Sequence, residues 1–431
     1  MARYFIWTIG CQMNKAESQR IARYLDSAGY QPASSLWKAD LAVLNTCVVR
    51  QSAENRVLGT LGLLKGIKRE RPNLSIVVTG CFVDSNIQGL KKRFPQVDFS
   101  FKPGAYSELT GWAEKHGIPA AEQELLGCGG NDTGGISSPC TFVPIIQGCN
   151  NFCSYCIVPY RRGREVSRPL QEVVCEVREL VKRGAKEVTL LGQKVDSYGH
   201  DLPQQLDLAD LLTELNCIDE LARIRFLTNH PRDMSQKLIK AMASLNKVCE
   251  HLDLAVQSGD DDILTAMRRG YTVQQFRKLV GTIRRSIPQI SLSTDIIVGF
   301  PGETEEQFER TFSLLREMRF DVVHVAAYSP RPGTIACRKY QDSVPSEAKR
   351  ERLARIERLQ ENIAAEINCS YLGKTVEVLV EGRKKGKWYG RSRTDKLVFY
   401  EHNHDQFGQL VRIRIDRTSP WALQGKIEHD N

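Results

Sequence analysis

Three cysteines stand within eight residues of this chain, and they constrain its fold more than any other feature. Cys149, Cys153 and Cys156 are spaced C-x3-C-x2-C, with Tyr155 directly before the last of them. Thiolates are the ligands that iron–sulfur clusters select, and three of them can hold three irons of a 4Fe–4S cube. The fourth iron then needs an outside ligand. A zinc knuckle is the alternative, but it wants four ligands, and no nearby His or Cys completes that set.

The spacing of these cysteines is similar to that of the radical S-adenosylmethionine (SAM) enzymes. The resemblance implies that the open iron chelates the amino and carboxylate groups of SAM. It also implies that Cys149, Cys153 and Cys156 are catalytic. Tyr155 joins the candidates for SAM binding because of its place in the motif.

Length, cysteine content and charge narrow the class of protein. A chain of 431 residues predicts two to three domains. Its 13 cysteines, an odd number, favour metal or catalytic thiols in a reducing cytoplasm over a disulfide framework. No apolar run of about 18 residues and no signal peptide stand out, so we expect a cytoplasmic protein. The net charge of +9 permits nucleic-acid binding without proving it.

A second cysteine pattern lies in the N-terminal part. Three short apolar runs, at residues 4–8, 41–44 and 74–78, are each followed by a polar, helix-like stretch, as in a parallel α/β sheet. The carboxyl ends of parallel strands line one crevice. A cysteine follows each run at that end: Cys11, Cys47 and Cys81. Singly, each could be an inert core residue, but together they predict a second three-thiolate 4Fe–4S site.

These cysteines stand in motifs that resemble those of the methylthiotransferases. The segments are Thr8-Ile-Gly-Cys-Gln-Met-Asn14, Asn45-Thr-Cys-Val-Val-Arg50 and Thr79-Gly-Cys81. The first is similar to the tRNA-modifying MiaB type, whereas the relatives that modify a ribosomal protein usually carry Gly-Cys-Pro-Lys-Asn there. The resemblance covers nearly the whole chain and implies a flavodoxin-like N-terminal sheet.

The central part predicts an open barrel. Six strand-like runs alternate with amphipathic segments, at residues 142–147, 187–191, 223–228, 251–256, 291–298 and 322–328. Six βα units are too few for a closed eight-stranded barrel and suit a partial (β/α)6 barrel, the architecture of radical-SAM cores. The residues that end these strands are therefore candidates for SAM binding: Gln193, Gln257, Ser258, Asp295 and Gly299. Each could equally be a loop residue with internal partners.

Two charged segments lie close to the central cysteines. One holds the arginines at 161, 162, 164 and 168, which could pair with the SAM carboxylate or with substrate phosphates, or could form a solvated loop. The other holds Lys194 and Asp196, where the family usually has asparagines. That departure puts the fine substrate preference in doubt, but not the reaction class.

The C-terminal part predicts a helix from Ser346 to about Asn368 and then β-strands between residues 372 and 427. Residues 383–396 carry seven Lys or Arg and one Asp, with two aromatic residues among them. Cations meet the phosphate backbone and aromatics stack on unpaired bases, although an ordinary basic hairpin is the alternative. The part resembles a TRAM domain, an RNA-binding barrel. Its candidate RNA contacts are Arg383, Lys384, Lys385, Lys387, Trp388, Tyr389, Arg391 and Arg393.

We therefore expect an N-terminal domain at residues 1–120, a Gly- and Ser-rich linker at 121–140 with exposed thiols at Cys128 and Cys140, a radical-SAM core at 141–371, and a TRAM domain at 372–428. The resemblance implies a tRNA methylthiotransferase with two 4Fe–4S clusters and SAM. Its target would be C2 of an isopentenylated adenosine beside the anticodon.

Its other expected partners are a one-electron reductant, such as flavodoxin or ferredoxin, and sulfur- or cluster-supply proteins, and we expect a monomer. Three alternatives remain open at this point. The same chemistry could act on threonylcarbamoyl-adenosine of tRNA or on an aspartate of a ribosomal protein. A noncatalytic iron–sulfur RNA-binding protein is the third.

Overall fold

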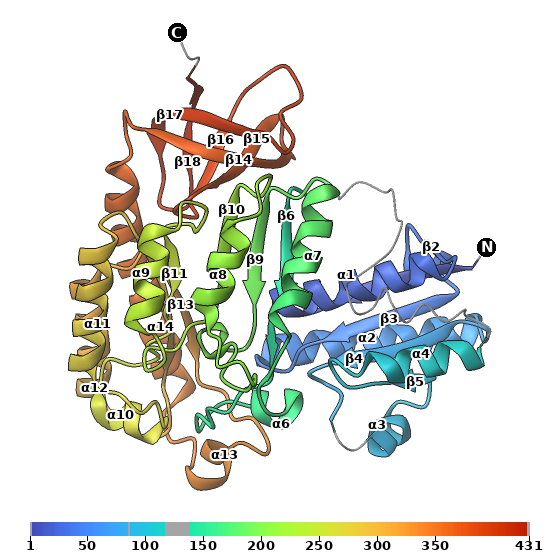
Figure 1. The fold of residues 1–431 in the computed structure, drawn as a ribbon. Helices are drawn as coiled ribbons and strands as arrows, with labels where there is room; N and C mark the ends of the chain where they lie inside the picture. Colours follow the sequence, from blue (N-terminus) through green and yellow to red (C-terminus); the bar gives the residue numbers. More distant parts are fainter. Residues whose placement is uncertain (1, 85–86, 117–137, 429–431) are drawn as a thin grey trace.

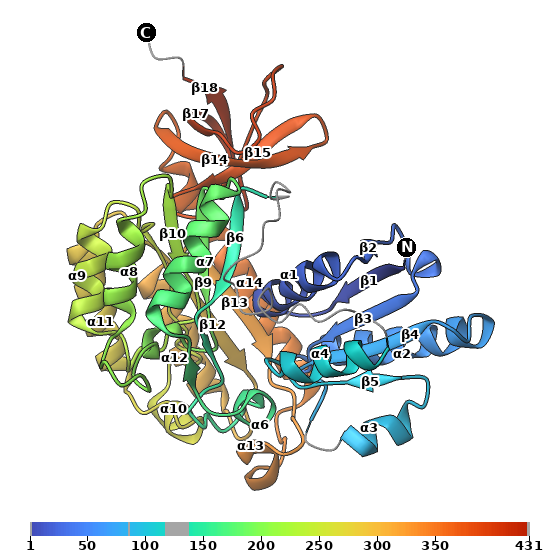
Figure 2. The ribbon, with the colours of Figure 1, turned by 45° about the vertical axis from the view of Figure 1, so that its right-hand side comes forward.

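The computed structural model describes residues 2–84, 87–116 and 138–428 (Figure 1). Most of the expected linker, with Cys128, lies outside these ranges. In Figures 1 and 2 the described chain forms three parts: an N-terminal α/β unit, a central arc of strands and helices, and a C-terminal barrel above the arc. No helix in the described ranges is long and apolar enough to cross a membrane.

The N-terminal unit is a five-stranded parallel sheet in the order β2-β1-β3-β4-β5. Its strands are β1 (Arg3–Thr8), β2 (Gln31–Pro32), β3 (Leu41–Thr46), β4 (Ser75–Gly80) and β5 (Phe99–Ser100). The three expected runs are β1, β3 and β4, the central strands of the sheet. The two edge strands have only two residues each, too short for a periodicity to indicate them.

Helices cover both faces of this sheet. They are α1 (Gln12–Ser27), α2 (Gln51–Glu70), α3 (Ile87–Arg93) and α4 (Tyr106–Lys115), with a 3-10 turn η1 (Leu36–Lys38). Helices α1 and α4 bury Tyr24 and Leu109 against one face. Helices α2 and α3 bury Leu61 and Leu90 against the other. This doubly wound arrangement confirms the flavodoxin-like expectation and places the ends of β1, β3 and β4 side by side.

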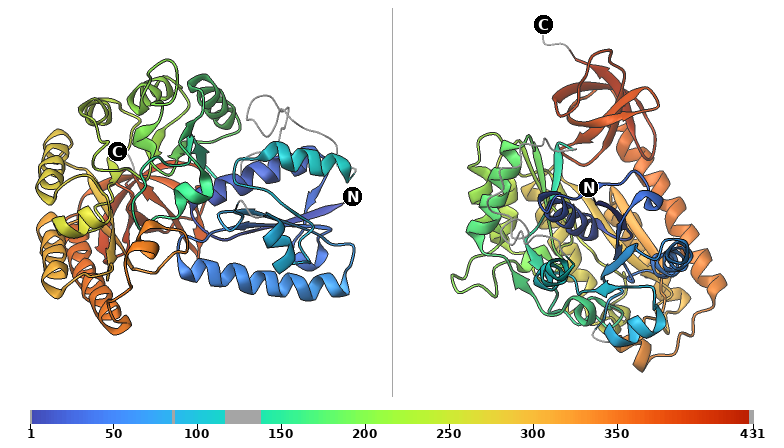
Figure 3. Two further views of the ribbon diagram at one scale, coloured as in Figure 1. Left: turned by 90° about the horizontal axis from the view of Figure 1, so that it is seen from below. Right: turned by 90° about the vertical axis from the view of Figure 1, so that its right-hand side faces the viewer.

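The central part contains the six expected strands: β6 (Cys140–Pro144), β9 (Glu187–Leu191), β10 (Arg223–Phe226), β11 (His251–Asp253), β12 (Ser291–Val298) and β13 (Val322–Ala327). They pair in parallel as β10-β9-β6 and β11-β12-β13. Parallel bridges from Ile224 to Val248 and from Asn229 to Leu254 join the two halves. The result is one open arc, which Figure 3 shows from below with its helices on the outside.

The helices of this part are α6 (Val158–Arg162), α7 (Leu170–Lys182), α8 (Leu208–Asn216), α9 (Gln236–Ser244), α10 (Asp261–Ala266), α11 (Val273–Ser286), α12 (Glu305–Met318), α13 (Ile335–Lys339) and α14 (Ser346–Cys369), with a 3-10 turn η2 (Val195–Ser197). The first expected strand, 142–147, is two elements. Strand β6 ends at Pro144, and β7 (Ile146–Gln147) pairs instead with β8 (Val166–Ser167).

The C-terminal part is a closed barrel in the order β14-β15-β16-β18-β17. Its strands are β14 (Thr375–Lys384), β15 (Lys387–Ser392), β16 (Leu397–Tyr400), β17 (Leu410–Thr418) and β18 (Leu423–Ile427). The expectation of an exposed linker thiol at Cys140 is wrong. Cys140 begins β6 and is half-buried, and burial beside Glu187 raises the pKa of its thiol.

Candidate functional site

The central cysteine triad lies in a loop that the barrel holds firmly. The amide of Gly148 donates to Oε1 of Gln193 at 2.6 Å, and Ser154 donates through its hydroxyl to the carbonyl of Ala266 at 2.7 Å. Gly148 has φ +80°, and a Cβ there would stand 1.9 Å from the carbonyl oxygen of Arg164. The loop therefore requires glycine at this position, and its backbone is fixed on both sides of Cys149.

The thiols of this triad influence one another. Burial raises the pKa of Cys149 to about 11 and that of Cys156 to about 12, and the charge of Cys153 adds to both shifts. All three cysteines are free of disulfides. Enclosed thiols this close together become thiolates when cationic metal binds them. This donor set fits an iron–sulfur cluster held by three cysteines.

The N-terminal triad converges as the strand pattern predicts. Cys11, Cys47 and Cys81 follow the neighbouring parallel strands β1, β3 and β4. Cys47 and Cys81 are buried, whereas Cys11 is exposed. Burial, then the charge of Cys81, and further the charge of Cys11 raise the pKa of Cys47 to about 11. The three thiols thus form a second set of the same chemistry, open to solvent on one side.

No group of three His, Cys, Asp or Glu side chains in the described ranges is close enough to hold a single metal ion. A cluster of four irons takes its thiolates from around its surface, so it needs wider spacing than one ion. Three cysteines without a fourth ligand suit such a cluster better than a zinc knuckle, which needs four ligands.

The glycines before Cys11 and Cys81 lie where the strand ends approach one another closely. A Cβ on Gly10 would lie 2.6 Å from the Cβ of Cys47, and one on Gly80 would lie 2.3 Å from the carbonyl oxygen of Thr46. Both glycines have positive φ. They therefore bring the three strand ends against one another, and in this way set the spacing of the thiols.

The arginines after the central triad have partners inside the protein. Arg161 pairs with Asp84 at 2.8 Å, and Arg164 stacks on the ring of Phe152 at 4.7 Å. Arg168 pairs with Glu172 and Glu176, both at 2.6 Å. Neither a solvated loop nor a set of free cations describes this segment. Through Arg161 and Arg162 this segment joins the central barrel to the N-terminal domain.

Arg162, at the end of α6, reaches across to the N-terminal triad. Its guanidinium binds the carboxylate of Glu17 through two nitrogens, at 2.6 and 3.2 Å. It donates to Oδ1 of Asn14 at 2.9 Å and to Sγ of Cys81 at 3.2 Å. Nearby, Val48 and Cys81 pack against Ile157, the residue after Cys156. Ile157 and Arg162, which follow Cys156 closely in sequence, therefore contact the N-terminal triad directly at Cys81.

A cavity of about 590 Å³ opens beside both triads. One wall comes from residues 49–52, just after Cys47, and another from Tyr155 and Cys156. The ends of β12 and β13 complete it, and among its lining residues are Gln257, Asp295, His324, Tyr328 and Arg331. Burial, reinforced by Asp253, raises the pKa of Asp295 to about 6.

Gln257 has the local geometry of a ligand-binding side chain. Its φ is +74°, an uncommon backbone conformation for a residue other than glycine. It is buried, and its Oε1 has no hydrogen-bond partner within the described residues. A buried amide oxygen without a partner, at the edge of a cavity, fits a ligand that carries a donor, such as the amino groups of SAM.

The other predicted SAM contacts lie elsewhere. Gln193 supports the cysteine loop through Gly148. Ser258 is wholly buried and contacts the hydroxyl of Thr311. Gly299 donates to Glu303, and a Cβ on it would lie 2.4 Å from the side chain of Lys349. These three have internal partners, whereas Tyr155, Gln257 and Asp295 meet at the cavity.

Sequence reasoning missed two polar residues of the cavity, Arg50 and His324. Both are exposed, and no motif marks His324. Arg50 was part of a quoted motif, but only the fold shows that the segment after Cys47 faces the barrel.

Comparison with known proteins decides the family. Residues 143–315 match the Radical SAM superfamily, residues 3–102 match "Uncharacterized protein family UPF0004", and residues 370–427 match the TRAM domain. Over 428 residues the chain is 52% identical to tRNA-2-methylthio-N(6)-dimethylallyladenosine synthase of Dehalococcoides mccartyi (strain CBDB1), covering 99% of each chain. The chain belongs to the family of these methylthiotransferases.

The synthase of Chloroflexus aurantiacus is 48% identical over all of this chain and 92% of its own length. Among solved structures, the radical SAM methyltransferase TsrM from Kitasatospora setae is similar with a TM-score of 0.56 and 16% identity, covering 78% of this chain and 77% of that one. At that identity the likeness concerns the fold. Membership of the methylthiotransferase family confirms the enzyme class and its cofactors, 4Fe–4S clusters and SAM.

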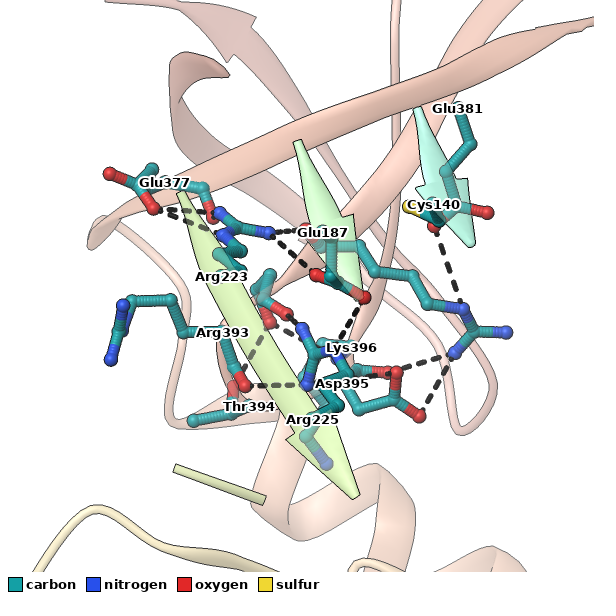
Figure 4. A network of polar contacts seen from close by, with 12 residues as sticks. Cys140, Glu187, Arg223, Arg225, Glu377, Glu381, Arg393, Thr394, Asp395 and Lys396 are labelled. Atoms are coloured by element: carbon teal, nitrogen blue, oxygen red, sulfur yellow. Dashed lines mark hydrogen bonds and ion pairs between the residues drawn. The ribbon is translucent and has the colours of Figure 1, made fainter. Parts of the chain in front are cut away.

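The end of the basic segment of the TRAM domain, at residues 391–393, faces the open central barrel. In Figure 4, Arg223 and Arg225 of β10 point up into this domain, and Arg393 comes from it. Arg225 donates to the carbonyls of Ser392 and Arg393 at 2.6 and 2.8 Å. Arg393 in turn binds the carboxylate of Glu250 at 2.7 and 2.8 Å. This end of the segment docks the domain.

The remaining predicted RNA contacts divide by exposure. Trp388 is 7% exposed and donates to the carbonyl of His402, so it belongs to the core of the small barrel. Half-buried Tyr389, Lys387 and Arg391 have protein neighbours in Phe399, Glu401 and Asp395 respectively. The hairpin tip is exposed and consists of Arg383, Lys384 and Lys385.

Lys194 and Asp196, which depart from the usual family residues, are both buried. Nζ of Lys194 lies 3.0 Å from Asp233 and 3.3 Å from Glu165. Asp196 accepts the amide of His230 at 2.6 Å. Neither residue lines the cavity described above. The two differences from the usual family residues therefore affect side chains that support the surroundings of the central triad, such as Glu165, and not the cavity wall.

Proposed function

We propose that this protein is a tRNA methylthiotransferase that replaces the C2 hydrogen of an N6-isopentenylated adenosine, beside the anticodon, with a methylthio group. The observation that carries the proposal is that Ile157, next to Cys156, packs against Cys81, and that one cavity is lined both by Cys156 and by the segment after Cys47. A reaction that removes a hydrogen and inserts sulfur needs both functions at one substrate atom. The relatives at 52% and 48% identity carry the name of this activity.

In the proposed mechanism the residues of the chain hold the two clusters and SAM and orient the target base. Cys149, Cys153 and Cys156 hold the cluster that binds SAM, and Cys11, Cys47 and Cys81 hold the one that carries sulfur. When bound, SAM and its cluster supply the one-electron chemistry that removes hydrogen from an unactivated C–H bond. Tyr155, Gln257 and Asp295 are our candidates for SAM contacts.

We assign the target base to this cavity, with the segment after Cys47 on one side of it and Cys156 on the other. Residues 49–52 follow Cys47 and form the side that faces the N-terminal triad. Cys156 forms the opposite side. Holding both reactive centres around one pocket would make the sulfur insertion a local step.

Two measurements test the activity. Purified protein with SAM and dithionite, under anaerobic conditions, is expected to release 5′-deoxyadenosine. Nucleosides from a deletion strain, analysed by mass spectrometry, are expected to lack the methylthio group on isopentenyl-adenosine and regain it on complementation. Persistence of that base in the deletion strain contradicts the proposal. Loss of methylthio-threonylcarbamoyl-adenosine, or of the modified ribosomal aspartate, would assign one of the alternative substrates instead.

Iron content tests the assignment of the triads. With two 4Fe–4S clusters, the reconstituted protein should hold about eight irons per chain. Replacing Cys11, Cys47 and Cys81 together by alanine should leave about four, and the same should hold for Cys149, Cys153 and Cys156. An unchanged iron content in either triple variant removes that triad from the proposal.

The proposal includes partners and a compartment. RNA contacts are assigned to the exposed tip of the TRAM domain at Arg383, Lys384 and Lys385, supported by its charge. A flavodoxin or ferredoxin would supply single electrons, and sulfur- or cluster-supply proteins would renew the N-terminal cluster. We further propose a monomer that works in the cytoplasm, where thiols stay reduced.

A further inference from the structure

We propose that Arg162 and Arg269 are a matched pair of positioning residues, one for each cysteine triad, and that each sets the reduction potential of its own cluster. Each donates from a buried guanidinium to one cysteine sulfur. The inference rests on the cluster sites proposed above and adds a function for side chains outside the ligand set.

Arg162 serves the N-terminal triad. It comes from the barrel, in the helix that begins two residues after Cys156, and is 7% exposed. Its Nε lies 3.2 Å from Sγ of Cys81, while its other nitrogens are held by Glu17 and Asn14. Glu17 and Asn14 lie on α1, which begins directly after Cys11. The guanidinium thus fixes the sulfur of Cys81 relative to α1, the helix that follows Cys11.

Arg269 serves the central triad in the same manner and is 4% exposed. One of its nitrogens lies 3.6 Å from Sγ of Cys153 and 3.5 Å from the hydroxyl of Tyr155. The others donate to the carbonyl of Ala255 at 2.6 Å and to the hydroxyl of Tyr271 at 3.2 Å. Both side chains carry a positive charge beside the sulfurs, because the guanidinium group of arginine stays protonated in proteins.

Two of the other four sulfurs accept from neutral amides. Sγ of Cys47 accepts from the amide of Val49 at 3.5 Å, and Sγ of Cys149 accepts from the amide of Asn151 at 3.4 Å. A cationic donor is stronger than a neutral amide, and hydrogen bonds to cluster sulfurs and nearby charge are what tune the potential of such clusters. A buried positive charge favours the reduced, more negative state. Each arginine should therefore raise the potential of the cluster that it touches.

The test uses the full chain with one cluster at a time. Cys149→Ala, Cys153→Ala and Cys156→Ala together isolate the N-terminal cluster, and the equivalent N-terminal triple isolates the central one. Redox titration followed by electron paramagnetic resonance then gives each midpoint potential. Arg162→Gln should shift only the N-terminal cluster to a more negative potential, and Arg269→Gln only the central one. Arg161→Gln, whose partner is Asp84 near the surface, is the control and should shift neither.

A second variant separates charge from packing. Glu17→Gln removes the negative charge beside Arg162 and should move the N-terminal cluster in the opposite direction, to a less negative potential. Unchanged potentials with four irons bound overturn the inference, and so do equal shifts of both clusters by either arginine variant. Absence of iron in the two triple-cysteine backgrounds refutes the cluster sites themselves, which is a failure of the proposed function and not of the arginines. The glutamine variants could also lose iron, and Arg162→Lys or Arg269→Lys then keeps the charge. If the lysine variant regains iron but its cluster does not regain the original potential, the arginine only holds the sulfur, and the electrostatic part of the inference is overturned.

Discussion

Buried ionisable residues around the central triad are held by specific partners, and one of them works against stability. Asp196 is buried in the turn after β9, and burial raises its pKa to about 7. Next to it, burial lowers the pKa of His230 to about 2, so that this ring stays neutral. Ionisation of Asp196 therefore costs the folded protein stability, and the size of this cost grows as pH rises.

We expect Asp196→Asn to stabilise the protein at pH 8 and to have a smaller effect at pH 5. The pKa of Asp196 is higher in the folded than in the unfolded protein, so between about pH 4 and 7 the folded protein binds a proton that the unfolded chain has lost. The folded protein therefore becomes less stable, relative to the unfolded chain, as pH rises through this range. The gain at pH 8 should be about 1–3 kcal/mol, below the limit of about 1.4 kcal/mol per pKa unit. Urea unfolding at both pH values measures it.

Asp219, an exposed carboxylate, provides the matched control for that variant. Asp219→Asn should leave the difference between pH 5 and pH 8 unchanged. An equal gain for Asp196→Asn at both pH values would contradict the assignment of a raised pKa to this residue.

At the scale of elements, the spacing of the N-terminal thiols depends on how closely three strand ends approach. Gly80 has φ +93° and no room for a Cβ beside Thr46. We expect Gly80→Ala to destabilise the protein by about 2 kcal/mol or more, since it adds a clash to a strained backbone. The same variant should lower the iron content of the N-terminal site, measured after reconstitution.

Gly59 offers the opposite case in the same domain. It lies in the exposed part of α2, and a Cβ there would meet no atom within 4 Å. Gly59→Ala should stabilise the helix by about 0.5–1 kcal/mol and leave iron binding unchanged. Equal effects of the two substitutions on the unfolding midpoint would argue against the close approach at Gly80.

The tip of the β14–β15 hairpin is the element to which we assign RNA contacts. Replacing Arg383, Lys384 and Lys385 by alanine should weaken tRNA binding, and the slope of log K against log salt should fall by about 2–3. Filter binding at several salt concentrations measures both. Lys240, Lys278 and Arg285 are equally charged and exposed on the outer helices α9 and α11, so their triple alanine variant is the control. Equal losses in the two variants would show that only net charge matters.

The elements themselves were largely predictable, whereas the partners of their side chains were not. The central strands followed from apolar runs, and the convergence of Cys11, Cys47 and Cys81 followed from the geometry of parallel sheets. The role of Arg393 could not be predicted, because its partner Glu250 lies 143 residues away in sequence. The role of Trp388 could not be predicted either, because alternation alone does not tell which face of a strand points to the interior of the barrel.

At the scale of the whole molecule, contacts between the parts decide how the site is assembled. The buried pair of Arg162 and Glu17 joins the N-terminal sheet to the barrel, and Met13 of α1 packs against Leu191 of β9. Arg331, which lines the cavity, pairs with Glu54 of α2 at 2.8 Å. The cavity is therefore a product of the assembled chain, which no single domain contains.

The TRAM domain should be docked on the barrel and not merely tethered to it, and Arg225 provides the test (Figure 4). Arg225→Ala removes two hydrogen bonds to the domain and leaves buried Glu187 without its nearest cation. Breaking a buried pair in this way costs about 3–5 kcal/mol. We expect limited proteolysis to release the C-terminal domain faster in Arg225→Ala, and thermal unfolding to begin earlier. Arg383→Ala, at the exposed tip of the same domain, should match the unsubstituted protein in both assays. Identical proteolysis of Arg225→Ala and Arg383→Ala would mean that the other contacts, such as Arg393 with Glu250, hold the domain in place without Arg225.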